Sequence, residues 1–93
     1  MAAGRPYVVS VATRAAKDVR RLPGKTQSAV IAALEGLALD PRGGKPLSGE
    51  LAGIWSLRRG DYRILYRIDE RAFRVEIARV GHRREVYRRA GLR

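Results

Sequence analysis

The chain has 93 residues, of which 20 are Lys or Arg and nine are Asp or Glu, so its net charge at pH 7 is +11. A chain of this length can bury one small core, and its 45% hydrophobic content is enough to form it. The absence of Cys and the single His exclude disulfide frameworks, thiolate metal sites and most metal-dependent hydrolases. No apolar run approaches the roughly 20 residues that a membrane-spanning helix needs, and no signal-peptide core is present. We therefore expect one domain over residues 1–93, in the cytoplasm, without a membrane segment, a cofactor or a metal.

The positive charge predicts a polyanionic partner, because such an excess attracts polyanions and speeds encounter with them. Seventeen of the 20 basic residues are Arg. The planar guanidinium binds phosphate through two hydrogen bonds and stacks on bases, so this bias favours nucleic acid. A GC-rich genome would also raise the Arg content, but it would not produce the net charge.

The N-terminal half predicts a strand followed by two helices. Residues 7–12 are apolar and β-branched, which is typical of a short buried strand. Thr13 is the expected N-cap of a first helix that ends at Pro23-Gly24, and a second helix is expected over Lys25–Leu39, before Asp40-Pro41. Their short connection predicts an antiparallel helical hairpin. The apolar stripes consist of Ala15, Val19 and Leu22 in the first helix and Val30, Ala33, Leu34, Leu37 and Ala38 in the second.

The C-terminal half predicts three strands after a loop at residues 41–46. The expected strands are Leu51–Arg58, Tyr62–Ile68 and Phe73–Val80, joined by turns at residues 60–61 and 69–71. Gly81 is expected to end the last strand, and residues 84–90 are expected to form a short strand or a helical turn. The order βααβββ predicts an α+β fold with an N-terminal strand, a helical hairpin and a C-terminal antiparallel β meander. We expect the hairpin to cover one sheet face and Arg63 and its neighbours to line the other.

The candidate chemical groups lie between Lys45 and Arg89. Without a metal, RNA cleavage needs a base for the 2′-hydroxyl, cations for the phosphorane-like transition state and an acid for the leaving 5′-oxygen. Arginines suit the second role, and His82 is the one side chain of the type that changes charge near neutral pH. Tyr87 suits base stacking or proton transfer. The candidate catalytic residues are Arg63, His82, Arg83 and Tyr87, and the candidate RNA-binding residues are Arg42, Lys45, Arg58, Arg59 and Arg84.

Each of these residues also has a structural explanation. A single Arg is commonly part of a solvated face, a His beside a glycine is commonly a loop residue, and a Tyr is commonly a packing aromatic. Trp55 is expected in the core rather than as a platform for a base. Asp61 and Glu85 are expected to form a turn and to pair locally with arginines. Spacing alone therefore leaves function and packing open at each position.

Three segments nevertheless share a pattern with a known family. KPLSGELAGIW, GDYRILYRID and VGHRREVYRR follow a helical hairpin ending near Leu22-Pro23, and together they resemble the RelE branch of the RelE/ParE toxins of bacterial toxin–antitoxin systems. The resemblance covers nearly the whole chain. It implies a fold similar to small microbial ribonucleases and cleavage of messenger RNA in the ribosomal A site. It also implies an acidic, RelB-like antitoxin, with operator DNA bound only through the antitoxin complex.

The resemblance also assigns roles to individual residues. Arg63 matches the arginine thought to stabilise the transition state, and Tyr87 matches the tyrosine near the C-terminus. His82-Arg83 falls where the family has a basic residue followed by a catalytic arginine. The interval from Gly81 to Tyr87 is one residue shorter than in the best-known RelE, so Arg83 and Arg84 compete for that role.

The proton acceptor is where this chain departs from the family pattern. Ile54 and Ser56 occupy the positions of two lysines in the best-known RelE, and neither can act as the base. A related branch uses a Glu on the preceding loop, where this chain has Lys45. The base is therefore His82, Lys45 or missing, and the sequence favours His82.

Two other functions fit parts of the sequence. One is a ParE-like, non-catalytic toxin that inhibits DNA gyrase, and the other is a plain module that binds RNA or the ribosome. Charge alone points to the second. The ParE-like branch generally lacks the Arg/His/Tyr set, which favours RNA cleavage.

Overall fold

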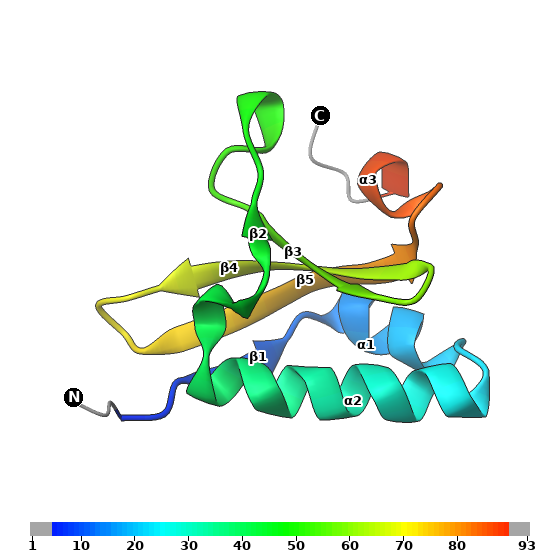
Figure 1. Ribbon diagram of the computed structural model, residues 1–93, viewed down its shortest axis with the longest axis horizontal. Coiled ribbons are helices and arrows are strands. Elements are labelled where there is room, and N and C mark those ends of the chain that lie inside the picture. The colour runs from blue at the N-terminus through cyan, green and yellow to red at the C-terminus, as the bar shows by residue number, and fades with distance from the viewer. Residues whose placement is uncertain (1–4, 90–93) are drawn as a thin grey trace.

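Two helices cover one face of a five-stranded sheet in the computed structural model, which describes residues 5–89 (Figure 1). The sheet order is β1-β5-β4-β3-β2. Its strands are β1 (Val8–Val11), β2 (Lys45–Pro46), β3 (Trp55–Arg59), β4 (Tyr62–Asp69) and β5 (Arg74–His82). The helices are α1 (Thr13–Arg20), α2 (Gly24–Leu39) and α3 (Val86–Arg89), with 3-10 turns η1 (Pro41–Gly43) and η2 (Gly49–Leu51). The predicted α+β order of strand, two helices and meander is confirmed.

The core lies between the helices and the sheet, and the predicted apolar stripes form the helical side of it. Ala15 and Val30 are fully buried, and they meet Ile64, Val75 and other inward residues of β4 and β5. Burial of such side chains supplies most of the stabilisation of short helices. The cap of α1 differs from the prediction by one residue, because Ala12 is the N-cap and no side chain caps the helix.

Strand β1 pairs with β5 in parallel, from Val8 opposite Arg74 to Val11 opposite Ile77, and then ends. The rest of β5 would expose unpaired backbone at this edge, but Asp18 of α1 covers it. The Val80 N–H donates to Asp18 Oδ2 at 2.9 Å, and Arg79 donates to both carboxylate oxygens at 2.9 and 3.1 Å. The hydrogen bonds that Arg79 donates to the Asp18 carboxylate raise the pKa of Arg79, against the lowering effect of burial. Side-chain exposure is 5% for Asp18 and 12% for Arg79, so this is a buried ion pair.

The predicted strand at Leu51–Arg58 begins four residues later than expected. Gly49 and Gly53 have φ angles of 66° and 95°, and the Ile54 N–H closes a turn on the Leu51 carbonyl at 3.0 Å. The segment before Trp55 is therefore a turn that glycine permits. The two-residue strand β2 was not predicted, because Lys45-Pro46 is too short to show alternation.

The last strand continues through Gly81 to His82 instead of ending at the glycine. Gly81 pairs with Arg63, and a Cβ built on it would lie 3.4 Å from Val86, so α3 packs closely over this position. A register shift near Leu65 places Ala78 as an extra residue in β5. Of the two forms expected for residues 84–90, the described part has the helical turn; residue 90 lies outside the described residues.

Tyr66 holds the loop before β2 against the sheet through two hydrogen bonds of its hydroxyl. Its hydroxyl donates to the Pro41 carbonyl at 2.7 Å and accepts from the Gly44 N–H at 3.1 Å. Burial raises the pKa of the phenol; the Gly44 N–H opposes this effect and the charge of Asp40 adds to it. A Cβ at Gly44 would lie 2.6 Å from the Tyr66 hydroxyl, so only glycine allows this approach. The loop thereby sets β2, and Lys45 with it, against β3. Within residues 5–89, no helix has the length and apolarity needed to cross a membrane.

Candidate functional site

The sheet face opposite α1 and α2, called the open face below, carries the candidate site. Leu57 and Ile64 point into the core, so Arg58 and Arg63, their neighbours along the strands, point away from the helices. Directly opposed residues share a face, and Arg58 is opposed to Arg63. Figure 1 shows that α3 and the loop between β2 and β3, which contains η2, project from this side of the sheet. The open face is therefore flanked by these two segments.

Lys45 and Ser56 lie on the same face as the two arginines. Ser56 is two residues before Arg58 on β3, and Lys45 of β2 is directly opposed to it. Lys45 is exposed whereas Ser56 is buried. The register therefore brings one amine and one hydroxyl next to the arginine pair.

Tyr87 reaches this site from α3. The single turn of α3 is held by Val86, which is 2% exposed and packs with Ile54 and Leu65 in a small second core on the open face. The Tyr87 ring packs against the same cluster, and its hydroxyl lies 3.1 Å from the Ser56 hydroxyl. The phenol oxygen is thus held over β3.

The arginine pair is oriented by backbone carbonyls of the β3–β4 turn. Arg63 Nη1 donates to the carbonyls of Gly60 and Tyr62 at 3.3 and 3.1 Å, and Arg58 Nε lies 3.4 Å from the Gly60 carbonyl. Neither guanidinium forms an ion pair with another residue in the described part of the chain. Opposite Arg63 on β5 is Gly81, which has no side chain to cover it. Two oriented cations without a carboxylate partner have the charge and the hydrogen-bond donors that an anion such as phosphate requires.

Arg83 lies in the turn after β5 and is tied to the β3–β4 turn. Its N–H donates to the Asp61 carbonyl at 2.7 Å, and its Nε is 4.0 Å from the Asp61 carboxylate. Both side chains are about half exposed or more, so this ion pair is weak. The contact brings Arg83 close to the segment that orients Arg63.

His82 lies on the helix side of the sheet rather than on the open face. It is opposed to Tyr62, its ring meets the Tyr62 ring edge-on at 5.7 Å, and both line a hollow of about 170 Å³ with Asp18 and other residues. His82 Nδ1 accepts a hydrogen bond from the Arg84 N–H at 3.2 Å. The neutral ring then carries its proton on Nε2, so neither nitrogen offers a ready lone pair.

Two candidate RNA-binding residues also lie away from the open-face arginines. Arg59 is opposed to Tyr62 and so projects toward the helix side. Arg42 forms an ion pair with Glu70 in the β4–β5 turn, at the other end of the sheet. Arg84 is exposed in the turn before α3. The structure therefore groups Lys45, Arg58, Arg63 and Tyr87, and does not group Arg42, Arg59 or His82 with them.

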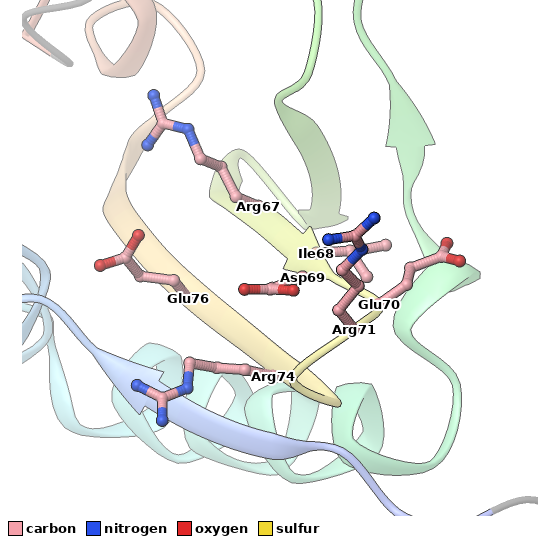
Figure 2. A pocket seen from close by; sticks show the side chains of 7 residues that line it. All are labelled: Arg67, Ile68, Asp69, Glu70, Arg71, Arg74 and Glu76. Atoms are coloured by element: carbon pink, nitrogen blue, oxygen red, sulfur yellow. The ribbon is translucent and has the colours of Figure 1, made fainter.

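A hollow of about 580 Å³ lies at the β4–β5 end of the sheet, among the side chains drawn in Figure 2. There Arg67 is opposed to Glu76 and Arg74 to Asp69, so each cation has a carboxylate across the ladder. The mixed charge makes this hollow a poorer site for a polyanion than the arginine pair.

Ser56 and Asp18 are polar residues whose contacts the sequence did not reveal. Ser56 stands between Trp55 and Leu57 in an apolar strand, and Asp18 lies among the inward positions of α1. The one signal in the sequence for such contacts was a polar residue at an inward-facing helix position or in the middle of an apolar strand. Residues 5–89 contain no group of three or more His, Cys, Asp or Glu arranged to hold a metal ion.

Comparison with known families decides what kind of protein this is. Residues 9–87 match the family model described as the ParE toxin of type II toxin–antitoxin systems. The chain belongs to this family of the RelE/ParE superfamily. Among the relatives of this ParE-family toxin, Toxin RelG of Mycobacterium tuberculosis is 49% identical over 86 residues, covering 90% of this chain and 99% of RelG. Toxin RelE of the same organism is 42% identical over 90 residues, covering 95% and 93%.

Solved structures agree with the fold of this ParE-family toxin. The toxin–antitoxin complex RelBE2 of Mycobacterium tuberculosis matches with a TM-score of 0.78 and 48% identity, covering 83% of this chain and 91% of that chain. The isolated Escherichia coli RelE toxin matches with a TM-score of 0.71, covering 82% and 83%, and at 22% identity it supports the fold alone. The RelE-type resemblance of the three sequence segments is thereby confirmed.

Proposed function

We propose that this toxin is a ribosome-dependent mRNA endonuclease that arrests translation by cleaving messenger RNA in the ribosomal A site. The observation that carries the proposal is the open face, where Arg58 and Arg63 are oriented together without a carboxylate partner and Tyr87 is held nearby. The relatives named RelG and RelE, at 49% and 42% identity, add support.

The proposed reaction is attack of the 2′-hydroxyl on the adjacent phosphodiester, without a metal. The bond from O2′ to phosphorus forms and the bond from phosphorus to O5′ breaks, which yields a cyclic phosphate and a 5′-hydroxyl. Arg63 and Arg83 stabilise the charge on the phosphorane-like transition state. Tyr87 gives its proton to the leaving O5′, and a base takes the proton of the 2′-hydroxyl. Arg58 holds a neighbouring phosphate, with Arg84 at the edge of the site.

We place the base at Lys45 rather than at His82. Lys45 lies on the open face opposite Ser56, whereas His82 lies on the helix side with Nδ1 already accepting a hydrogen bond. A lysine takes this role only as the neutral amine. Lys45→Met, which keeps the length and removes the amine, is expected to lower the single-turnover cleavage rate about 100-fold, within the usual range for a lost general base.

The matched comparison is His82→Gln, which is expected to change the single-turnover rate on programmed ribosomes far less. A larger loss from His82→Gln than from Lys45→Met would return the base to the histidine.

We also propose that an acidic, RelB-like antitoxin neutralises this toxin, and that operator DNA is bound only through their complex. A net charge of +11 favours an acidic partner, and the related RelBE2 structure is a toxin–antitoxin complex. Co-purification with the product of an adjoining acidic reading frame tests this partner. Action on ribosomes would place the toxin in the cytoplasm.

The second candidate is gyrase inhibition, which the ParE description of the matching family favours. Controlled expression followed by primer extension on cellular mRNA separates the two functions. We expect new 5′ ends within codons of translated messages. Intact mRNA together with trapped gyrase–DNA complexes would instead establish ParE-like action, and ribosome binding without either would leave a plain binding module.

A further inference from the structure

The Ser56 hydroxyl is a polar group in an apolar place. Ser56 is 8% exposed, and Leu65, its opposed residue on β4, belongs to the small core with Ile54 and Val86. A hydroxyl buried in such surroundings loses its water and is destabilising unless it is hydrogen-bonded. The partner that the structure provides is the Tyr87 hydroxyl, at 3.1 Å and 31 residues away along the chain.

The Tyr87 phenol depends on the sheet for its position. Its helix, α3, has four residues and is too short to be stable alone. Val86 anchors the helix, and the Tyr87 ring rests on the same cluster. These apolar contacts restrict the ring plane but leave the hydroxyl proton undirected, since a phenol can rotate that proton. The bond to Ser56 is the contact that constrains the hydroxyl itself.

Direction matters because a serine hydroxyl can donate and accept at the same time. When Ser56 donates to Tyr87 Oη, the phenol proton is left to point away from the sheet, toward a bound phosphodiester. The 3.1 Å separation of the two hydroxyl oxygens allows this direction of donation, because either atom can be the donor.

We propose that Ser56 is a positioning residue for Tyr87: its buried hydroxyl, 3.1 Å from the phenol oxygen, directs the Tyr87 proton toward the leaving group of the RNA substrate. This inference rests on the proposed endonuclease function. It gives a role to a strand residue that cannot itself take the proton of the 2′-hydroxyl.

The test uses ribosomes programmed with a defined mRNA and the full-length variants Ser56→Ala, Ser56→Thr, Tyr87→Phe and the Ser56→Ala/Tyr87→Phe pair. Ser56→Ala is expected to lower the saturating single-turnover rate about five- to tenfold, as for the loss of one hydrogen bond, with the half-saturating ribosome concentration unchanged. Ser56→Thr, which retains the hydroxyl, is expected to restore most of the rate. In the Tyr87→Phe background, Ser56→Ala is expected to cost nothing further.

A wild-type rate for Ser56→Ala, or an equal loss in both backgrounds, would overturn the proposal. The wild-type protein and the same four variants are also compared in urea unfolding. This measurement reports the coupling free energy between the two hydroxyls without any cleavage. If the wild-type protein fails to cleave, the endonuclease function fails. In that case, a coupling free energy between Ser56 and Tyr87 in the unfolding experiment would establish their contact independently of cleavage. The absence of such a coupling would show that the contact does not form either.

Discussion

Arg63→Ala is expected to lower the single-turnover cleavage rate on programmed ribosomes by about 100- to 1,000-fold, the usual loss when one preorganised donor to a transition-state charge is removed. Arg63 is held toward the open face by two backbone carbonyls, at 3.3 and 3.1 Å, so its guanidinium is oriented before RNA arrives. Arg63→Lys keeps the charge but loses the planar fork, and we expect it to recover only part of the rate.

The matched control for Arg63 is Arg67→Ala. Arg67 lies four residues along the same strand, on the same face, but opposite Glu76 at the other end of the sheet. Its removal lowers the net charge equally, so it reports the general electrostatic contribution. Equal rate losses from the two variants would mean that Arg63 acts only through the charge of the surface. Circular dichroism of both proteins checks that neither change disturbs the sheet.

Asp18→Ala is expected to lower the free energy of unfolding by about 3 kcal/mol, as when one partner of a buried ion pair is removed. Such a loss is a large part of the roughly 5–15 kcal/mol that stabilises a small protein. The carboxylate accepts from the Val80 N–H and pairs with Arg79, so its removal leaves a buried guanidinium and an open strand edge. Urea unfolding measures the effect directly.

Two further variants divide this effect between charge and hydrogen bonding. Asp18→Asn keeps an acceptor for the Val80 N–H and is expected to lose less than Asp18→Ala. Glu35→Ala, an exposed carboxylate on α2, is the control and is expected to change stability by no more than about 0.5 kcal/mol. An Asp18→Ala loss as small as that of Glu35→Ala would show that the ion pair contributes no net stability, which is possible when desolvation cancels attraction.

Much of the fold could be predicted because its elements have strong local patterns. The stripes of α1 and α2 repeat at helical spacing, and β4 alternates between apolar residues and arginines except at Leu65, so periodicity identified both. The prediction failed where a strand was too short to show alternation, and where a glycine was expected to end a strand but lies within it. The strand β2 has only two residues, and Gly81 lies within β5, paired with Arg63, instead of ending the strand.

The candidate site could be predicted in part, since strand alternation placed Arg63 on the face away from the helices. Alternation could not place His82, because the extra residue in β5 changes which side the following residues face. It also could not connect Ser56 with Tyr87, which reside on different elements.

By itself, the sequence determined the strong positive charge through its composition and the element order through periodicities that extend over a few residues, and three of its segments carried the family resemblance. The tertiary structure decided the parallel pairing of β1 with β5, the covering of the β5 edge by Asp18, and the side on which each candidate residue lies. Those contacts join residues that are far apart in the chain: Val8 pairs with Arg74, and Asp18 accepts from the Val80 N–H, 62 positions away. Their existence depends on how the helices and strands pack together, which no local pattern encodes.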